Sequence, residues 1–279
     1  MFKVFQLWQL PLLSAIIWWG MLIALLACWS AQGKPVYDWM YEVDDGQVDQ
    51  TFLYISDIAA KNDRANLQPI FIACSAAQGL LFVMSLCAEL YLRSVERLQQ
   101  GIANPRGVKI ALGVAVFMAL CGELGILFVS IFNTREFHDA HISLLIVFIV
   151  CVGVSSLSSI AEYSILGKDY PGKRHVFVSL ICRVIWFCIE LALAIAFATL
   201  RFDHKDQSSG CEWAVSFVYP FYQLIMVWDL WPAHNKTRGH YGDNSKYPVE
   251  ETFYDTEMVH PSATDAGSEK NFLPHSTNF

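Results

Sequence analysis

Four ionisable side chains outside the apolar stretches could take part in chemistry. Asp57 lies in the segment between the first two stretches, and His138, Asp139 and His141 lie together just before the fourth. A carboxylate near imidazoles can exchange protons at neutral pH or bind a metal ion. The same residues can equally form hydrogen bonds that tie two loops together. We prefer this structural interpretation, so these four are only candidate catalytic residues, and neither a metal site nor a cofactor is expected.

A second group of ionisable side chains lies inside the apolar stretches: Glu123, Glu162, Arg183 and Glu190. An ionisable group that faces lipid costs several kcal/mol, so each should face other helices and have a partner. Arg183 and Glu162 come out at similar depths, roughly 12 and 9 Å from one boundary at 1.5 Å per residue, and we predict an ion pair. Glu123 and Glu190 both lie about 21 to 23 Å deep and could share a proton or a cation. A structural polar network is the preferred interpretation, and a transport site is the alternative.

The elements that position these residues are apolar runs long enough to cross a bilayer. The chain is 54% hydrophobic and 16% charged, and a helix needs about 20 apolar residues to cross roughly 30 Å of hydrocarbon. Six such runs predict an all-α polytopic membrane protein, with one six-helix bundle in residues 1–231. The first run exceeds the 7 to 15 residues of a signal-peptide core, so we expect a retained helix rather than a cleaved signal. The predicted spans are 10–31, 68–92, 108–132, 142–166, 176–200 and 213–231.

The direction of the spans follows from their Lys and Arg residues, because cytoplasmic loops carry an excess of positive charge. Twelve of the nineteen flank one side, including Arg93, Arg106 and Lys168, and six flank the other. Both termini are therefore predicted to be cytoplasmic. The loops 32–67, 133–141 and 201–212 should face the lumen or the exterior.

Residues 232–279 change in character, with Pro, Gly, Ser, Asp and Glu and few apolar residues. Such a composition predicts a disordered cytoplasmic tail. The net charge of −7 and the lack of a basic stripe argue against binding to nucleic acid. Cys28 and Cys211 would both lie near the outer face, where a disulfide between them is possible and is left open.

Two further features concern the helices themselves. Small residues crowd the fourth stretch, among them Gly153, Ser155 and Ser159, which favours close helix packing. The alternative is a polar cavity lined by the serines. Pro220 is the proline that interrupts a span.

Several short motifs, in this order along the chain, resemble a known family. They are Tyr54-Ile55-Ser56-Asp57-Ile58-Ala59-Ala60, Gly125 to Phe132 followed by His138 and His141, Glu162-Tyr163 with Leu166-Gly167, Glu190, and Glu212-Trp213 with Trp228-Asp229. The family groups the damage-regulated autophagy modulators (DRAM), the FGF-receptor-activating protein and the yeast suppressor-of-four-kinase protein, and the later motifs look like its fungal branch. Ala59 departs from the glycine that is common there, so the turn of this loop is expected to differ.

The resemblance implies a six-helix protein of the plasma membrane, or alternatively of the Golgi, ER or vacuole. The expected role is a non-enzymatic membrane organiser. It would act in phosphoinositide kinase recruitment or plasma-membrane lipid organisation, with membrane lipids and a kinase complex as partners of the cytoplasmic loops and tail. The first alternative is a remodelling factor for the lipid of glycosylphosphatidylinositol (GPI) anchors, acting at the luminal face through Asp57, His138, Asp139 and His141. An autophagy modulator or a transporter component is the second.

Overall fold

The computed structural model describes residues 6–43, 50–60, 66–95, 98, 105–169 and 174–233. These form helices and their connections, which confirms the predicted all-α fold class. Six helices are long: α1 (Gln9–Ala31), α4 (Gln68–Ser94), α5 (Pro105–Ile131), α6 (His138–Asp169), α7 (Arg174–Leu200) and α8 (Lys205–Leu230). Two are short, α2 (Asp38–Val43) and α3 (Ile55–Ala59), and a 3-10 turn (Trp231–Ala233) follows α8. The predicted disorder of the tail concerns residues that, from 234 onward, lie outside the described ones.

Helices α1, α4, α5, α6 and α7 are long and apolar enough to cross a membrane by length and composition. Helix α8 is less hydrophobic because its polar residues include Ser208, Ser209, Gln223 and Asp229, yet these four side chains are buried. With 26 residues, α8 is about 39 Å long and also reaches across the hydrocarbon. The chain is thus an integral membrane protein with six long helices.

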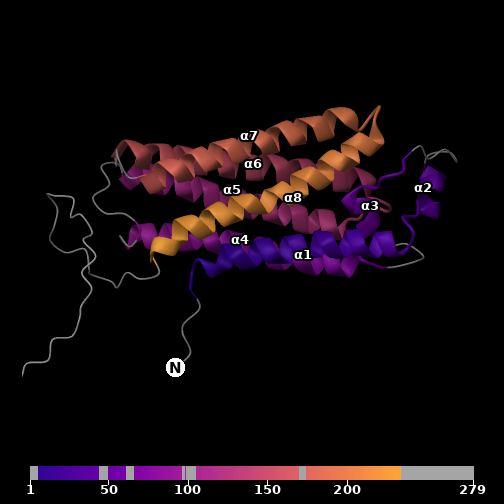
Figure 1. The fold of residues 1–279 in the computed structure, drawn as a ribbon, viewed down its shortest axis with the longest axis horizontal. Coiled ribbons are helices and arrows are strands. Elements are labelled where there is room, and N and C mark those ends of the chain that lie inside the picture. Colours follow the sequence, from indigo (N-terminus) through magenta and orange to yellow (C-terminus); the bar gives the residue numbers. More distant parts are fainter. Residues whose placement is uncertain are drawn as a thin grey trace, which may run out of the picture. The chain divides into compact units, whose positions relative to one another are not determined.

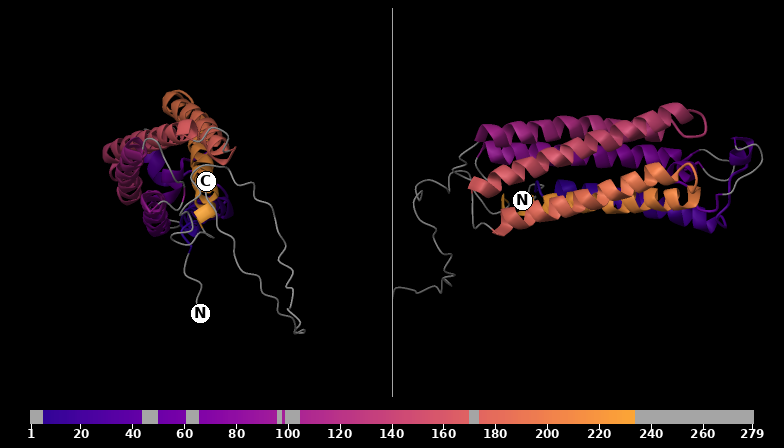
Figure 2. Two further views of the ribbon diagram at one scale, coloured as in Figure 1. Left: turned by 90° about the vertical axis from the view of Figure 1, so that its left-hand side faces the viewer. Right: turned by 90° about the horizontal axis from the view of Figure 1, so that it is seen from above.

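The six long helices form a closed ring of neighbours. Each packs on the next in the order α1, α4, α5, α6, α7 and α8, and α8 returns to α1. Figure 1 shows the long helices side by side, with α2 and α3 together at one end, and Figure 2 shows the same bundle from the end and from above. By the predicted topology, the end that holds α2 and α3 is the outer one.

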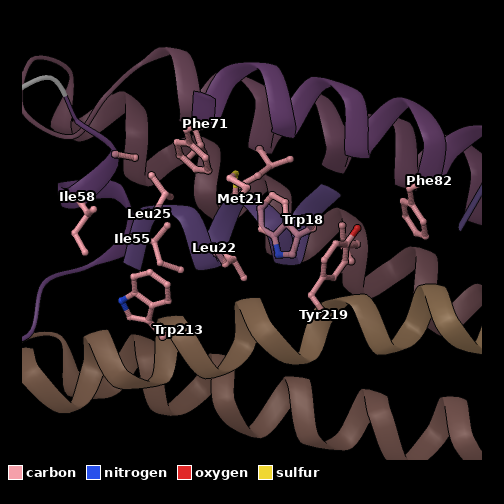
Figure 3. Close-up of a cluster of buried hydrophobic side chains, with 14 of the residues drawn as sticks. Trp18, Met21, Leu22, Leu25, Ile55, Ile58, Phe71, Phe82, Trp213 and Tyr219 are labelled. Atoms are coloured by element: carbon pink, nitrogen blue, oxygen red, sulfur yellow. The ribbon is translucent and has the colours of Figure 1, made fainter. Parts of the chain in front are cut away.

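The main core lies between α1, α3, α4, α5 and α8. The cluster contains Trp18, Leu22 and Leu25 of α1, Ile55 and Ile58 of α3, and Trp213 of α8 (Figure 3). The short helix α3, which carries the sequence motif around Asp57, is therefore anchored by burial of its apolar residues. This anchoring fixes where the polar residues of the motif lie.

Helices α5 and α6 approach most closely at two glycines. A Cβ atom added at Gly122 would lie 2.8 Å from Val152 Cγ2, and one added at Gly125 would lie 3.1 Å from the backbone nitrogen of Phe148. Ser155 Oγ donates to the carbonyl of Ala115 across the same contact at 2.8 Å. Helix packing thus accounts for Ser155, whereas a Cβ at Gly153 would meet no atom within 4 Å.

Pro220 lies inside α8, where its missing N–H and its ring disturb the hydrogen bonds of the preceding turn. Indole N–H groups satisfy the carbonyls there. Trp18 donates to the carbonyl of Ser216 and Trp19 to that of Phe217, both at 2.9 Å, and Trp186 donates to that of Val218 at 3.0 Å. Neighbouring helices commonly re-satisfy backbone groups that a proline frees in a membrane helix. The hydrogen bonds to the turn before Pro220 therefore join α8 to α1 and α7.

Candidate functional site

The first turns of α8 hold residues 51–55 of the first outer loop (32–67) in place through hydrogen bonds. The Asp206 carboxylate accepts from the backbone N–H of Thr51 at 2.8 Å, from its hydroxyl at 2.7 Å and from the N–H of Phe52 at 2.9 Å. Burial acts to raise the pKa of Asp206, but these hydrogen bonds outweigh it and lower the pKa, so the carboxylate is ionised at neutral pH.

Three more side chains on the same face of α8 continue this contact toward α3. Ser209 donates to the carbonyl of Phe52 at 2.6 Å, and Trp213 donates to that of Leu53 at 3.0 Å. Glu212 accepts from the backbone N–H of Ile55 at 2.7 Å, at the first residue of α3. Backbone groups of residues 51, 52, 53 and 55 are thus hydrogen-bonded to side chains of α8.

The docked loop forms one wall of a cavity of about 440 Å³ at the outer end of the bundle. Tyr54, Ser56 and Asp57 line it on the loop side, and the end of α7 and the start of α8 line it opposite. Among the described residues, the acidic, basic and histidine side chains in its wall are Asp57, Arg135, His138, His141, Arg201, Lys205 and Glu212. A volume of this size lies in the range of small-ligand sites.

Three of the four candidate catalytic residues lie around this one cavity. Asp57 is only 6% exposed, and His138 and His141 lie in the wall beside it. Asp139 is not part of the wall and is exposed. The structure therefore brings together residues that are more than 80 positions apart, but not the complete set.

His141 is hydrogen-bonded to the backbone, which restricts the proton transfers that its ring can carry out. Its Nδ1 lies 3.1 Å from the carbonyl oxygen of Val129 and 2.8 Å from that of Phe132, at the end of α5. Because carbonyl oxygens only accept, Nδ1 must carry the proton, which leaves Nε2 as the nitrogen that can accept a proton. Within the described ranges, no group of three or more His, Cys, Asp or Glu residues could hold a metal ion.

Four charged residues of the cavity wall are not among the candidate catalytic residues predicted above: Arg135, Arg201, Lys205 and Glu212. In the sequence, the three cations contribute only to the charge count that predicts the topology, and Glu212 belongs only to a family motif. Their positions in the last two outer loops could have identified them as cavity residues, since both loops lie at the outer end of the bundle.

The buried ion pairs inside the bundle differ from the predicted pair. Arg183 pairs with Asp229 of α8, with its Nη2 2.7 Å from Oδ2, and donates to the hydroxyl of Tyr222 at 3.0 Å. Glu162 instead pairs with Arg93 of α4, which also binds Glu89 at 2.6 Å. The predicted pair of Arg183 and Glu162 was wrong because Arg93, assigned to the cytoplasmic flank, is buried at the end of α4.

The ring of Tyr163 connects the two ion-pair groups. The guanidinium carbon of Arg183 lies 4.2 Å from its centroid and that of Arg93 lies 5.3 Å from it, while its hydroxyl donates to Glu89 at 3.0 Å. Cations near an aromatic face are stabilised by its quadrupole. The network therefore links α4, α6, α7 and α8.

Glu123 and Glu190 are not bonded to each other. Tyr219 donates to Glu123 at 2.5 Å, whereas Glu190 lines a cavity between α6, α7 and α8, whose wall also contains Tyr219. Among the described residues no hydrogen bond or ion pair joins the two carboxyls, so the shared site suggested by their depth is not formed by direct contact. Cys28 and Cys211 are both free thiols, so the disulfide left open above is not formed.

Comparisons with known proteins agree with this architecture. Residues 6–233 match the family described as the Frag1/DRAM/Sfk1/Cwh43P N-terminal domain. Protein SFK1 of Saccharomyces cerevisiae is 27% identical, over 94% of this chain and 90% of that protein. Protein sfk1 of Schizosaccharomyces pombe is also 27% identical, over 80% of this chain and 63% of that protein. No solved structure matches. The family match spans every long helix, so this chain belongs to the Frag1/DRAM/Sfk1/Cwh43P family.

Proposed function

We propose that the chain is a non-enzymatic membrane organiser whose cytoplasmic face gathers anionic lipids and recruits a phosphoinositide kinase complex. The two SFK1 relatives and the family resemblance support this role. Four exposed cations at the predicted cytoplasmic end of the bundle are the observation on which it depends.

These cations lie at one end of three neighbouring helices. Arg106 and Lys109 are in the first turns of α5, Lys168 is in the last turn of α6, and Arg174 begins α7. All four side chains are exposed. Anionic lipids of the cytoplasmic leaflet attract such residues with about 1 kcal/mol per Lys or Arg near the surface.

The bundle beneath the cations is held together by apolar and ionic contacts. Val108, Tyr163, Leu166 and Val176 form a small buried cluster between α5, α6 and α7. The ion pair of Arg93 and Glu162 lies next to it, on the same stretch of α6 as Tyr163. Because the apolar cluster joins α5, α6 and α7 and the ion pair fixes α6 to α4, the cations are presented as one surface rather than on independently moving ends.

The test is affinity capture of the tagged full chain from fungal membranes, followed by quantification of the co-purified phosphoinositide kinase. The variant Arg106→Gln/Lys109→Gln/Lys168→Gln/Arg174→Gln should recover several-fold less kinase. The matched control, Arg106→Lys/Lys109→Arg/Lys168→Arg/Arg174→Lys, keeps the charge and should recover the wild-type amount. Equal kinase recovery from the neutral variant and the control would contradict the role of this surface.

A truncation tests the contribution of the tail. A chain that ends at Ala233 keeps every described helix, so its bundle should remain folded. If the tail takes part in recruitment, the truncated chain captures less kinase than the full chain. Unchanged recovery would exclude recruitment by the tail and leave the basic surface as the contact.

A further inference from the structure

Three cavities follow one another from the outer end of the bundle into its middle. The outer cavity of about 440 Å³ shares Ser56, His141 and Phe197 with a neck of about 60 Å³. The neck shares Phe148, Ala194 and Val215 with a third cavity of about 310 Å³, which we call the slot. Their shared wall residues align the three cavities along α6, α7 and α8, and we call this series the column.

The chemistry of the column changes along its length. The wall of the outer cavity is charged, and the three cations Arg135, Arg201 and Lys205 outnumber the carboxyl groups of Asp57 and Glu212. The slot is lined mainly by apolar side chains, for example Val152, Leu157 and Leu191, with Glu190 as its charged residue. From Arg201 to Trp186, the column extends over about 22 Å of α7 at 1.5 Å per residue.

We propose that this column holds one membrane lipid with a phosphate in its headgroup, the headgroup in the outer cavity and an acyl chain running through the neck into the slot. The proposal concerns the opposite end of the bundle from the kinase-recruiting surface and does not depend on it.

The outer cavity suits a phosphate because several sources of positive potential meet there. Arg201 is half-buried beside the cavity and can bind phosphate through its planar guanidinium. Helices α6 and α8 both begin at this end, with His138 and Lys205, and helix N-termini favour anions. Arg135 and Lys205 add charge while also contacting other groups of the protein, so Arg201 is the cation on which the proposal chiefly depends.

The slot suits an acyl chain because it is apolar and adjoins the lipid-facing surface of the bundle. Val150, Leu157 and Leu191 of its wall are 48 to 55% exposed, which places the slot at the boundary with the bilayer. A Cβ at Gly153 would meet no atom within 4 Å, so this part of α6 leaves room for a ligand. A lipid could therefore enter sideways from the membrane.

The experiment uses the full chain reconstituted in phosphatidylcholine vesicles that contain a photoactivatable phosphatidylcholine, with the reactive group in its acyl chain. A diacylglycerol with the same chain but no phosphate is the comparison probe. After illumination, labelled peptides are quantified by mass spectrometry. Phosphatidylcholine should label the slot segments 148–157, 186–194 and 215–219. The diacylglycerol should label them about tenfold less, which corresponds to about 1.4 kcal/mol and to the loss of one charge-assisted hydrogen bond to phosphate.

Two pairs of variants separate binding in the column from general contact with lipid. Gly153→Leu fills the slot and should abolish its labelling. Its matched control is Gly113→Leu on α5, where a Cβ also meets no atom within 4 Å and which lines none of the three cavities, and it should label like the wild type. Arg201→Gln should reduce labelling about tenfold, by the same estimate, while Arg201→Lys keeps most of it.

Three results would overturn the proposal. One is equal labelling of Gly153→Leu and Gly113→Leu, both taken from monodisperse protein. Another is equal labelling by the diacylglycerol and phosphatidylcholine together with no effect of Arg201→Gln, which would mean that no phosphate is recognised. Complete displacement of the probe by inorganic phosphate would show that the cavity takes free phosphate without the acyl chain.

Discussion

At the scale of single residues, the strongest constraint is the pair of buried arginines. Arg183 is 1% exposed, and its partners Asp229 and Tyr222 are buried with it. Removing one member of a buried ion pair leaves an uncompensated charge, whereas replacing both by apolar residues is often tolerated. The two kinds of substitution should therefore differ sharply in stability.

We predict that Arg183→Met lowers the free energy of unfolding by about 3–5 kcal/mol, because Asp229 loses its cation in a buried site. The double variant Arg183→Met/Asp229→Leu should recover most of this loss. Unfolding of detergent-solubilised protein by denaturant measures both. Lys34→Gln, an exposed substitution, is the control. A double variant that is as unstable as the sum of its single variants would show that the pair is not coupled.

The sequence predicted that buried charges would be paired, but not which charges pair. Depth along each helix correctly indicated that Arg183 and Glu162 lie in the same half of the bundle. The rotation of each helix about its axis decides the partners, and it depends on packing that a single sequence does not reveal. For the same reason Glu123 and Glu190, although similar in depth, are not joined by a direct hydrogen bond.

At the scale of the elements, the contact between α5 and α6 depends on the absence of side chains at two positions. A Cβ at Gly125 would lie 3.1 to 3.3 Å from the backbone of α6, and backbone cannot move aside as a flexible side chain can. Small residues at helix interfaces in membranes allow such close approach.

Gly125→Ala is expected to destabilise the protein by about 1–3 kcal/mol, because it forces the two helices apart. Gly113→Ala on the same helix meets nothing within 4 Å and should be neutral or slightly stabilising, since alanine favours helix by about 1 kcal/mol over glycine. Denaturant unfolding of both variants under one condition makes the comparison. Equal stability of the two variants would contradict the close contact.

Each predicted hydrophobic stretch lies on one of the long helices, because uninterrupted apolar length is a strong signal. The start of α8 was less accessible to this reasoning. The apolar run begins near Trp213, but the helix begins at Lys205 and its polar first turns bind the outer loop. Hydropathy marks where lipid begins, not where a helix begins, so the residues that organise the outer cavity were outside the predicted span.

At the scale of the whole molecule, both proposals depend on which end of the bundle faces the cytoplasm. The charge asymmetry predicts that the basic ends of α5, α6 and α7 are cytoplasmic and that α3 is on the opposite side. The structure gives the helical architecture and the family match gives the family, but neither gives this orientation.

Glycosylation can test the orientation. The sequence Asn-Gly-Thr inserted into the loop 32–67 should acquire a glycan, because that loop is predicted to face the lumen or the exterior. The natural Asn235-Lys236-Thr237 should remain unmodified on the cytoplasmic side. Endoglycosidase treatment before gel electrophoresis shows which site is used. A glycan on Asn235 would reverse the topology and exchange the faces assigned to the two proposals.

The indoles that bind α8 beside Pro220 give the protein an internal optical reporter. Trp18, Trp19 and Trp186 each donate to a different carbonyl of one turn, so any straightening or twisting of α8 would alter the surroundings of all three rings at once. The wavelength of their fluorescence emission should therefore shift when a bound lipid or a partner changes the curvature of this helix. Such changes could be followed over time in unlabelled protein.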